Sequence, residues 1–424
     1  MRAAEIGSQR ILLLASPTSY RVAAYREAGH RLGLCVLVAC DGSQALIADS
    51  IDGLRLDLSN TESTLNAIVD EHGKRPFCAV VSADDSTAEL AVVIATQLGL
   101  AHNPLSAARM TRRKDLARDC LAKAGLPVPG FTRLDLGKPL DSQLRRIRFP
   151  CVVKPLAMSA SRGVIRANDV AELLSACERV SKIVSLCEDA DERRTLLIED
   201  YLPGIEVAVE GLLRGGVLEI LAVFDKPEPL EGPYFEETYY ITPSSHSGAM
   251  QDRIRQRVGQ ACQAYGLVEG PVHAEARLHK GEAWLLEIAA RTIGGDCARL
   301  LSFGTGTSLE SLVLGSAAGL PLSTESAAGA AGVLMIPIER GGTLRRVEGL
   351  LAASTIEYVD DVAITVREGY ELVPLPEGSS YLGFIFASAP TPLAVEQALR
   401  DAYACLNVIV APVLPVEAVS CVTS

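Results

Sequence analysis

The sequence has few aromatic residues and no excess of basic ones, and both shortages argue against a nucleic-acid-binding protein. Phe, Trp and Tyr make up 5% of the 424 residues, with one Trp, and 40 Lys and Arg stand against 52 Asp and Glu for a net charge of −12. Nucleic-acid-binding proteins usually carry a basic surface and aromatic side chains on which bases stack. We therefore expect no nucleic-acid partner.

Long apolar runs and paired cysteines are also missing. No stretch reaches the roughly 18 uninterrupted apolar residues that span a bilayer, and the N-terminal segment with its short run Ile11–Ala15 lacks the length of a signal peptide. The 11 cysteines are odd in number and form no C-x-x-C motif, which is typical of reduced cysteines packed as small hydrophobic residues. We expect a cytoplasmic protein with no membrane partner.

Several motifs of nucleotide binding and catalysis are absent. The loop after the first apolar run reads Ser16-Pro17-Thr18-Ser19 instead of G-x-G-x-x-G, which argues against NAD binding. There is no Walker A sequence, no G-x-S-x-G and no H-E-x-x-H. The six histidines do not cluster with ligand spacing, so a structural zinc site is not expected.

The order of apolar and amphipathic segments predicts an α/β protein. At 424 residues, two to three domains are expected. In the first hundred residues, predicted buried strands alternate with predicted helices, which implies a doubly wound parallel sheet. The strands are Ile11–Ala15, Leu34–Ala39 and Phe77–Ser82, and the helices are Tyr20–Leu32, Thr61–His72 and Thr87–Leu98.

The remaining chain reads as strands with few helices. A predicted strand, Cys151–Pro155, precedes a loop of small residues, Leu156–Gly163. Further along, a predicted helix near Asp252–Tyr265 comes before a predicted hairpin, and a last helix lies near Pro392–Leu406. The other predicted strands are Thr195–Glu199, Ile205–Leu213, Leu218–Phe224, Val272–His279 and Ala283–Ile288.

Lys154 stands at the end of an apolar strand, directly before the small-residue loop Leu156–Gly163. A lysine at a strand end can reach phosphate oxygens, and Ser and Gly backbone N–H groups can close over them. An exposed strand-end lysine beside a flexible turn is the alternative, and it is the commoner case for the pattern alone.

The segment from Leu197 to Glu210 combines an extended stretch with acidic residues. An extended segment between two lobes can offer backbone groups to an adenine edge, and nearby acids can accept from the exocyclic amine or the ribose hydroxyls. A strand–turn–strand with solvated acids remains the alternative.

Two acids in the predicted hairpin, Glu275 and Glu287, face each other or not according to the loop length. A three-residue loop would place them directly opposite on one face, whereas a two-residue loop would place them on opposite faces. Like charges in opposition require a cation, and Mg²⁺ accepts carboxylate oxygens together with phosphates. Arg291, beyond the second strand, could then clamp a phosphate or an oxyanion.

In order and spacing, these elements resemble the ATP-grasp superfamily, specifically its carboxylate–amine ligases and among them the L-amino acid ligases. The resemblance covers nearly the whole chain, from the entry segment 102–118 to residues 369–383. It implies an α/β ATP-grasp fold with three parts. These are an N-terminal doubly wound parallel-sheet (pre-ATP-grasp) domain at residues 1–102, a central two-lobed ATP-grasp region at 103–320 with a lid at about 148–204, and a small C-terminal α+β closing domain at 321–424.

The resemblance also implies cofactors and site residues. ATP and Mg²⁺ are expected, with Mn²⁺ as a substitute, and Arg291 would be the catalytic residue that stabilises the transferring phosphoryl group and the oxyanion. Mg²⁺ would be held by Glu275 and Glu287. ATP would be bound by Lys114, Lys154, Ser159, Ser161, Gly163, Glu199, Tyr201, Leu202 and Glu206. The substrate would contact Glu237, Arg291, Gly294 and Gly295.

Two of these assignments leave alternatives open. Glu237 is expected to recognise a substrate ammonium, but a surface acid in a Pro-rich loop is an equal alternative. Many family members carry Asn two residues after the second metal acid, whereas this chain has Ala289, which leaves the number of Mg²⁺ ions open.

The function implied is an ATP-dependent ligase that joins a small-molecule carboxylate to an amine through an acylphosphate, with release of ADP and phosphate. Amino acids, or an amino acid and a small carboxylic acid, would be the substrates, and a homodimer is suggested. The alternatives are another ATP-grasp reaction of the purine-pathway or carboxylase type and a nucleotide-binding regulatory protein without turnover.

Overall fold

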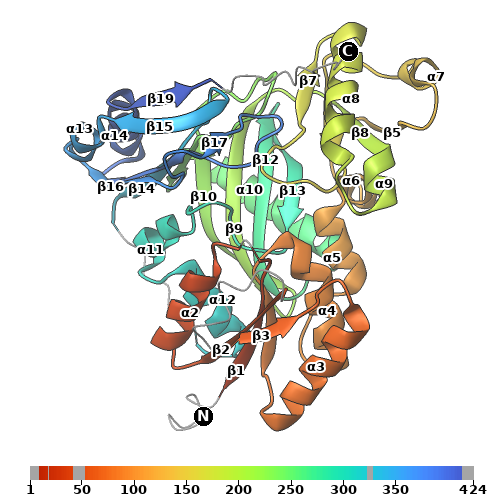
Figure 1. Ribbon diagram of the computed structural model, residues 1–424, viewed down its shortest axis with the longest axis vertical. Helices are drawn as coiled ribbons and strands as arrows, with labels where there is room; N and C mark the ends of the chain where they lie inside the picture. The colour runs from red at the N-terminus through yellow and green to blue at the C-terminus, as the bar shows by residue number, and fades with distance from the viewer. Residues whose placement is uncertain (1–8, 18, 42–52, 322–327, 413–424) are drawn as a thin grey trace, which may run out of the picture.

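The computed structural model describes residues 9–17, 19–41, 53–321 and 328–412, which form four β-sheets with helices packed against them. Figure 1 shows the N-terminal sheet at the bottom, a second small sheet at the upper right and the C-terminal strands at the upper left, around the long green strands of the largest sheet. The expected α/β class with a parallel N-terminal sheet is confirmed by this arrangement.

The N-terminal sheet has four parallel strands in the order β3-β2-β1-β4. Leu12 and Leu14 pack with the helices on one face, whereas Ile11 and Leu13 pack with those on the other. Because both faces are covered, the strands are apolar throughout, which is why sequence alone predicted three of them. The elements are β1 (Arg10–Leu14), α2 (Val22–Arg31), β2 (Cys35–Asp41), β3 (Gly53–Leu56), α3 (Thr61–Lys74), β4 (Ala79–Ser82) and α4 (Ala88–Gln97).

Strand β3 was not predicted. It is four residues long, reads Gly-Leu-Arg-Leu, and exposes Gly53 and Arg55 at the edge of the sheet. A short edge strand with polar residues lacks the apolar run that marks the other three.

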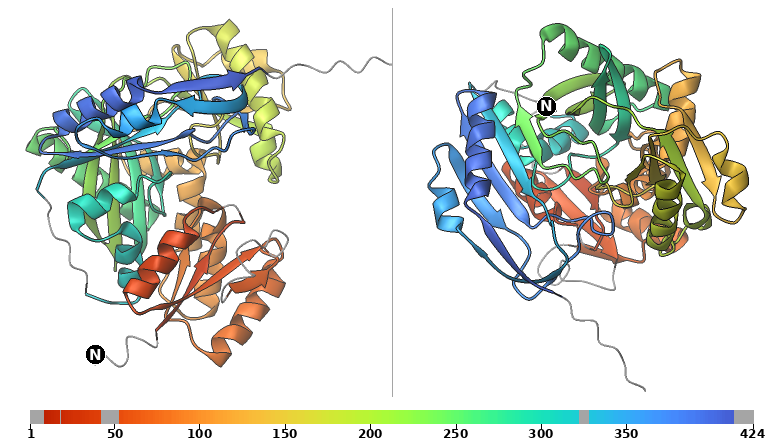
Figure 2. Two further views of the ribbon diagram at one scale, coloured as in Figure 1. Left: turned by 60° about the vertical axis from the view of Figure 1, so that its left-hand side comes forward. Right: turned by 90° about the horizontal axis from the view of Figure 1, so that it is seen from above.

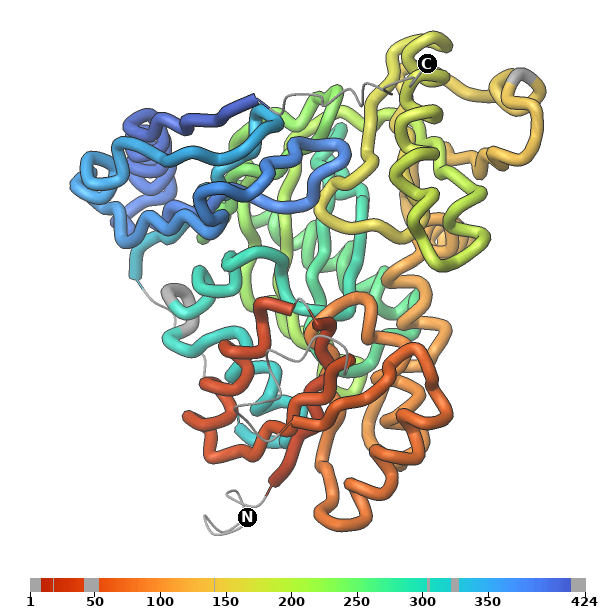
Figure 3. The backbone as a smooth tube through the Cα atoms, in the orientation of Figure 1, coloured from red at the N-terminus to blue at the C-terminus, as the bar shows by residue number. Residues whose placement is uncertain are grey.

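Two helices connect the N-terminal sheet to the second sheet, as the tube in Figure 3 traces. They are α5 (Leu105–Arg112) and α6 (Lys114–Lys123). The second sheet, which we call the lid sheet, has the antiparallel order β5-β8-β6-β7. It comprises β5 (Phe131–Asp135), α7 (Leu140–Leu144), β6 (Cys151–Pro155), β7 (Ile165–Ala167), α8 (Val170–Val184), α9 (Ala190–Arg194) and β8 (Thr195–Asp200).

The largest sheet has eight strands in the order β13-β12-β9-β10-β11-β14-β18-β16. Its central part comprises β9 (Ile205–Arg214), β10 (Val217–Lys226), β11 (Tyr239–Thr242), α10 (Gly248–Tyr265), β12 (Gly270–His279), β13 (Glu282–Ala289), α11 (Arg299–Thr305) and α12 (Leu309–Ala317). The apolar side chains of α10 pack with those of β9, β12 and β13 in one buried core. This core supports the strands that carry the expected metal acids.

The C-terminal strands continue this sheet instead of standing apart from it. Strand β14 (Ala330–Ile336) pairs with β11 and with β18 (Gly383–Ala389). The largest sheet therefore contains strands from both sides of the expected domain boundary at residue 320. The boundary itself stays a prediction. The remaining elements are β15 (Gly342–Glu348), α13 (Leu350–Ser354), β16 (Val359–Ile364), β17 (Glu371–Leu372), α14 (Pro392–Ala404) and β19 (Asn407–Ala411), of which β17, β15 and β19 form a separate small sheet.

The N-terminal sheet, the lid sheet and the C-terminal strands are arranged around the central strands of the largest sheet, as the two views of Figure 2 show. The loops after β1 and β4 leave the carboxyl edge of the N-terminal sheet, where ligands of parallel sheets usually bind. Within the described residues, no helix combines the length and the apolar character needed to cross a membrane.

Candidate active site

One cavity of about 990 Å³ is lined by residues from all of these parts. The β1–α2 and β4–α4 loops, the lid sheet, the largest sheet and the segment between β17 and β18 each contribute to its wall. Of the residues expected to form the site, 14 line this cavity: Lys114, Lys154, Ser159, Ser161, Glu199, Tyr201, Leu202, Glu206, Glu237, Glu275, Glu287, Arg291, Gly294 and Gly295. The structure therefore brings together segments that are far apart in the sequence.

Gly163 is the residue of that set that the cavity wall does not include. Its N–H donates to the Pro376 carbonyl at 2.9 Å, and so it is not directed at a phosphate. Its φ is +72°, and a Cβ would lie 2.7 Å from Pro155 Cγ, so this position requires glycine for the turn. In this arrangement Gly163 shapes the loop, and its expected contact with ATP stays a prediction.

The two expected phosphate lysines have different partners. Lys154 Nζ lies 2.7 Å from Glu199 Oε2. Lys114 Nζ donates to the Met158 carbonyl at 2.7 Å and lies 3.0 Å from Glu287 Oε2. Burial lowers the pKa of Lys154, and Glu199 partly offsets this effect. Both lysines line the cavity, where phosphate groups could meet them.

Glu199 is held by a buried arginine that sequence reasoning missed. Arg118, on α6, donates to Glu199 Oε1 at 2.7 Å and to the Leu286 carbonyl at 2.7 Å. Burial alone would raise the pKa of the Glu199 carboxyl, but Arg118 and Lys154 outweigh it and lower the pKa to about 2. Its carboxylate is thus committed to these two cations, so an adenine would meet the backbone of this segment. No spacing rule marks Arg118, because burial of an arginine depends on tertiary packing.

An apolar and aromatic slot lies next to the segment after β8. The ring of Tyr201 stacks on Phe235 with centroids 6.5 Å apart. The guanidinium groups of Arg166 and Arg277 lie 4.1 Å and 5.5 Å from the centroid of the Tyr201 ring. Arg277 also donates to the Leu202 carbonyl at 2.7 Å. Such a slot suits a planar base whose edge hydrogen-bonds to the backbone.

Lys226 joins three acids of the site, and sequence reasoning did not single it out. Its Nζ lies 2.8 Å from Glu206, 2.8 Å from Glu237 and 3.6 Å from Glu275. Burial would lower the pKa of Lys226, but the three carboxylates outweigh it and raise the pKa. Oxygens of the three acids lie within 4.8 Å of one another. Lys226 ends a strand, as Lys154 does, and this shared position is the signal that could have identified it.

Glu206 and Glu237 use both of their carboxylate oxygens on side chains of the protein. The second oxygen of Glu206 accepts from Arg277 Nε at 3.1 Å, and that of Glu237 accepts from the Tyr240 hydroxyl. Burial and Glu275 raise the pKa of Glu237. Their expected roles toward ribose and a substrate ammonium stay predictions, since each oxygen already has a donor.

Glu275 and Glu287 are direct partners across β12 and β13, although the turn has only two residues. The two-residue turn Lys280-Gly281 alone would place the two acids on opposite faces of the sheet. However, Leu286 is inserted as a bulge in β13, and it shifts the register by one residue between Ala276 and Glu275. The bulge therefore gives the geometry that a three-residue loop was expected to give. Carboxylate oxygens are the donors that Mg²⁺ prefers, so this pair fits the expected ion.

A buried histidine–glutamate pair lies beneath Glu275. His273 Nδ1 is 2.5 Å from Glu210 Oε1, and its Nε2 is 3.4 Å from Glu275 Oε1. Burial would lower the pKa of His273, but the two carboxylates outweigh it and raise the pKa to about 9. The two carboxylates thus favour the protonated form of His273, which carries positive charge beside Glu275.

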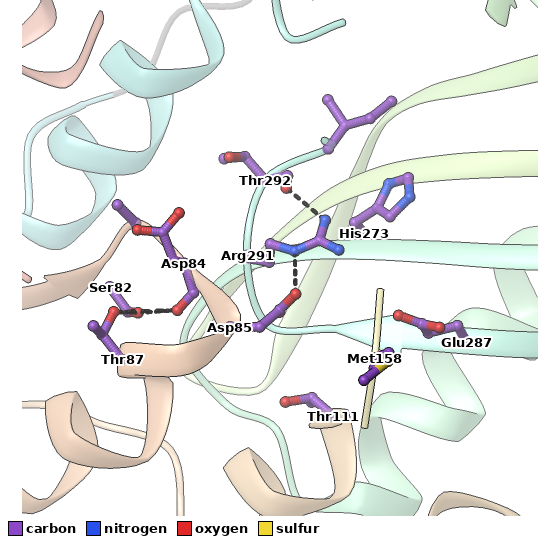
Figure 4. Close-up of polar contacts among 12 residues, drawn as sticks. Ser82, Asp84, Asp85, Thr87, Thr111, Met158, His273, Glu287, Arg291 and Thr292 are labelled. Atoms are coloured by element: carbon purple, nitrogen blue, oxygen red, sulfur yellow. Dashed lines mark hydrogen bonds and ion pairs between the residues drawn. The ribbon is translucent and has the colours of Figure 1, made fainter. Parts of the chain in front are cut away.

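Arg291 begins the loop that leads from β13 to α11. Its Nε donates to Asp85 Oδ2 at 2.8 Å and its Nη1 to the Thr292 carbonyl at 3.0 Å, as Figure 4 shows. Gly295 follows with φ +61°, and a Cβ there would lie 3.1 Å from Phe384 Cε1. Together with Tyr381 and Met335, Phe384 lines the cavity next to this loop. The loop thus places the Arg291 cation beside a glycine backbone that packs closely against Phe384, which belongs to an apolar wall of the cavity.

Comparisons with known proteins agree with this site. Residues 147–299 match the ATP-grasp domain family, and residues 334–411 match the L-amino acid ligase C-terminal domain 2. The crystal structure of an L-amino acid ligase from Bacillus licheniformis superposes with a TM-score of 0.79 at 25% identity, covering 95% of this chain and 99% of that one.

Two curated relatives match the chain over shorter stretches. Dapdiamide A synthase of Enterobacter agglomerans is 28% identical over 45% of this chain and 44% of its own length. D-alanine–D-alanine ligase of Methylococcus capsulatus is 28% identical over 40% of this chain and 52% of its own length. The chain thus spans about half the length of these two relatives.

The two family matches together cover more than half of the chain, and they fall on the lid, the acid-bearing strands and the C-terminal strands that line the cavity. The chain therefore combines an ATP-grasp domain with an L-amino acid ligase C-terminal domain, which is the organisation of an ATP-grasp ligase of the EC 6.3 type.

Proposed function

We propose that this protein uses ATP to join the carboxylate of an amino acid to the amine of a second amino acid, or of a similar small molecule, through an acylphosphate. The observation that carries the proposal is the convergence of charge in one cavity. Lys114, 3.0 Å from Glu287, faces the same space as Arg291 and Gly295. Phosphate-binding cations thus adjoin a loop suited to a carboxylate.

The first step would transfer the γ-phosphoryl group of ATP to a substrate carboxylate oxygen. The bond from the γ-phosphorus to the β–γ bridging oxygen breaks, the bond to the carboxylate oxygen forms, and ADP is released. Lys114 and Lys154 would hold the phosphates in line. Mg²⁺, held by Glu275 and Glu287, would supply neutralisation of charge on the phosphate oxygens. Catalysis of this kind depends on positioning and charge rather than on a covalent nucleophile of the protein.

The second step would be attack of the amine nitrogen on the acyl carbon. The carbon–oxygen bond to phosphate breaks, inorganic phosphate leaves and the amine loses a proton. Arg291 would stabilise the negative charge on the carbonyl oxygen in the tetrahedral intermediate. The backbone of Gly294 and Gly295 would approach the reacting carboxylate closely, since neither residue carries a side chain.

The names of the relatives support amino acids as substrates. One similar structure is named an L-amino acid ligase, and one curated relative is named a D-alanine–D-alanine ligase. A homodimer in the cytoplasm with ATP, Mg²⁺ or Mn²⁺ is part of the same proposal.

ADP release with single and paired amino acids, followed by mass spectrometry of the product, tests the proposal. Substrate labelled with ¹⁸O in its carboxylate should deliver one label to the released phosphate. Label in AMP, or none in phosphate, excludes the acylphosphate route. Release of ADP that depends on bicarbonate instead of an amine would favour a carboxylase, and nucleotide binding without release would favour a regulatory protein.

A further inference from the structure

The N-terminal sheet supplies one carboxylate to the loop that carries Arg291. Asp85 lies in the 3₁₀ turn η2 (Asp85–Thr87), at the carboxyl end of β4 and 206 residues before Arg291. Its Oδ2 accepts from Arg291 Nε at 2.8 Å, and the exposed fractions of the two side chains are 28% and 11%. Figure 4 shows the two side chains meeting between separate elements. Sequence reasoning assigned no role to Asp85.

This contact fixes the orientation of the guanidinium group. Asp85 takes the Nε hydrogen and the Thr292 carbonyl takes one on Nη1, while Nη2 has no acceptor among the described residues. In Figure 4 the third nitrogen points away from both partners, towards the side where His273 and Glu287 lie. Because the guanidinium is planar, holding its Nε side directs the Nη2 edge into the cavity that Arg291 lines.

Asp85 is itself on a braced turn. The hydroxyls of Ser82 and Thr87 lie 2.7 Å apart, and both donate to the Asp84 carbonyl, at 2.8 Å and 3.2 Å. The Asp84 carboxylate accepts from the Ser16 N–H at 2.9 Å, and also from Ser19 and Arg21. Burial alone would raise the pKa of Asp85, but Arg291 outweighs this effect and lowers it. A rigid, ionised acid therefore faces the arginine.

We propose that Asp85 is a positioning residue, which holds Arg291 so that its Nη2 edge meets the transferring phosphoryl group and the developing oxyanion. The inference rests on the proposed function. Arg21 offers a contrast, because it reaches the same loop only through the Ile293 carbonyl, at 3.2 Å from Nη2, and thus holds backbone and not the guanidinium. If the contact between Asp85 and Arg291 only joined the two domains, a change of charge at position 85 would not alter kcat for ADP release.

Asp85→Asn tests the inference, with Glu62→Gln on the exposed surface of α3 as the matched control. We expect kcat for ADP release to fall ~10- to 100-fold, because misplacement of a catalytic group by about 1 Å has effects of that size. The KM for ATP and the melting temperature should change little, and Asp85→Glu should keep more activity than Asp85→Asn. In an Arg291→Lys background, Asp85→Asn should have little further effect, since the two residues act as one unit. A kcat within twofold of wild type, or an equal loss in both backgrounds, overturns the inference.

A binding measurement separates this inference from the proposed function. The melting temperature is recorded with MgADP, and then with MgADP and aluminium fluoride, which mimics a transferring phosphoryl group. The wild-type protein should gain further stability with fluoride, and Asp85→Asn should lose that gain while keeping the shift due to MgADP. A variant that keeps the gain, or a wild-type protein without it, contradicts the positioning role. If no amino acid supports ADP release in the wild-type protein, the proposed function fails while this arm still reports on Asp85.

Discussion

Glu275 and Glu287 face each other because one residue, Leu286, is inserted between a two-residue turn and the second acid. The two carboxylates are each paired with a cation of the chain, Glu287 with Lys114 at 3.0 Å and Glu275 with Lys226 at 3.6 Å. A divalent ion can bind between two opposed carboxylates that each have a separate cationic partner, and its binding would bring the two carboxylates closer together.

Glu287→Gln should therefore remove most turnover and leave the fold intact. We expect a fall in ADP release on the order of 100-fold or more, because an electrostatic contribution to the transition state is lost. Glu282→Gln, at the partly exposed start of the same strand, is the control and should keep full activity. Turnover of Glu287→Gln close to wild type across a Mg²⁺ titration would show that the metal assignment is wrong.

The buried pair of Arg118 and Glu199 predicts a stability effect. Arg118 has 1% of its surface exposed and Glu199 has 2%. Removing Arg118 takes one of the two cations away from buried Glu199 and leaves the Leu286 carbonyl without this donor, so Arg118→Ala should lower the free energy of unfolding by about 3 kcal/mol. Chemical denaturation measures the change, with Arg145→Ala on the lid surface as the control. A loss below about 1 kcal/mol would contradict the buried charge pair.

The same pair predicts a pH dependence with a defined sign. The pKa of Glu199 is about 2 in the folded protein, below its ordinary 4.5, so folding favours the ionised form. The stability that this provides is present above about pH 4.5 and is lost as the pH falls towards 2. Melting temperatures of Glu199→Gln should fall less steeply over this window than those of wild type, whereas Glu62→Gln should follow wild type. Parallel curves for all three proteins would contradict the lowered pKa.

Sequence alone predicted the alternation of the N-terminal part, the acid-bearing hairpin and the small-residue loop after β6. Buried strands and amphipathic helices leave strong apolar patterns, and they were found within a few residues of their expected ends. The edge strand β3 and the continuation of the largest sheet into β14 were missed. Strand order is set by tertiary pairing, as between β11 and β14, and has no local pattern.

The candidate site was predicted unevenly for a similar reason. Residues with a position in a motif, such as Lys154 and Glu275, line the cavity as expected. Arg118 and Asp85 were not identified, because each matters through a partner far away in the chain. Lys226 was also missed, although it ends β10 and pairs with Glu206 only 20 residues before it. Gly163 has a sequence position that fits a phosphate loop, whereas its N–H donates to the Pro376 carbonyl in this structure, so its contact with ATP stays a prediction.

Contacts between the lid and the C-terminal strands predict a latch. Arg162 and Arg179 both bond to Glu377, the first to its carbonyl at 3.0 Å and the second to its carboxylate, at 2.8 Å from Nη2 to Oε2. Arg179 and Glu377 are each 41% exposed, so their pair contributes about 0–1 kcal/mol to stability.

Glu377→Ala should leave the melting temperature nearly unchanged but speed hydrogen exchange in the loop around Ser161 when nucleotide is absent. Glu178→Gln, which alters an exposed pair on the same helix as Arg179, is the control. A non-hydrolysable ATP analogue should slow exchange in this loop in both variants. Unchanged exchange in Glu377→Ala would show that the latch does not hold the lid.

The paired glycines after Arg291 offer a matched test of the substrate loop. Gly295 has φ +61°, which is unfavourable for a residue with a side chain, and an added Cβ would lie 3.1 Å from the ring of Phe384. At Gly294 the nearest atom to an added Cβ is 4.0 Å away, on Arg21, and φ is not in the left-handed region. Gly295→Ala should therefore lower stability by about 1 kcal/mol, and it should reduce kcat because the loop must shift beside Arg291. Gly294→Ala should retain wild-type stability, since its Cβ would make only an ordinary van der Waals contact with Arg21. Equal effects of the two substitutions on melting temperature and kcat would contradict a conformation-specific requirement at Gly295.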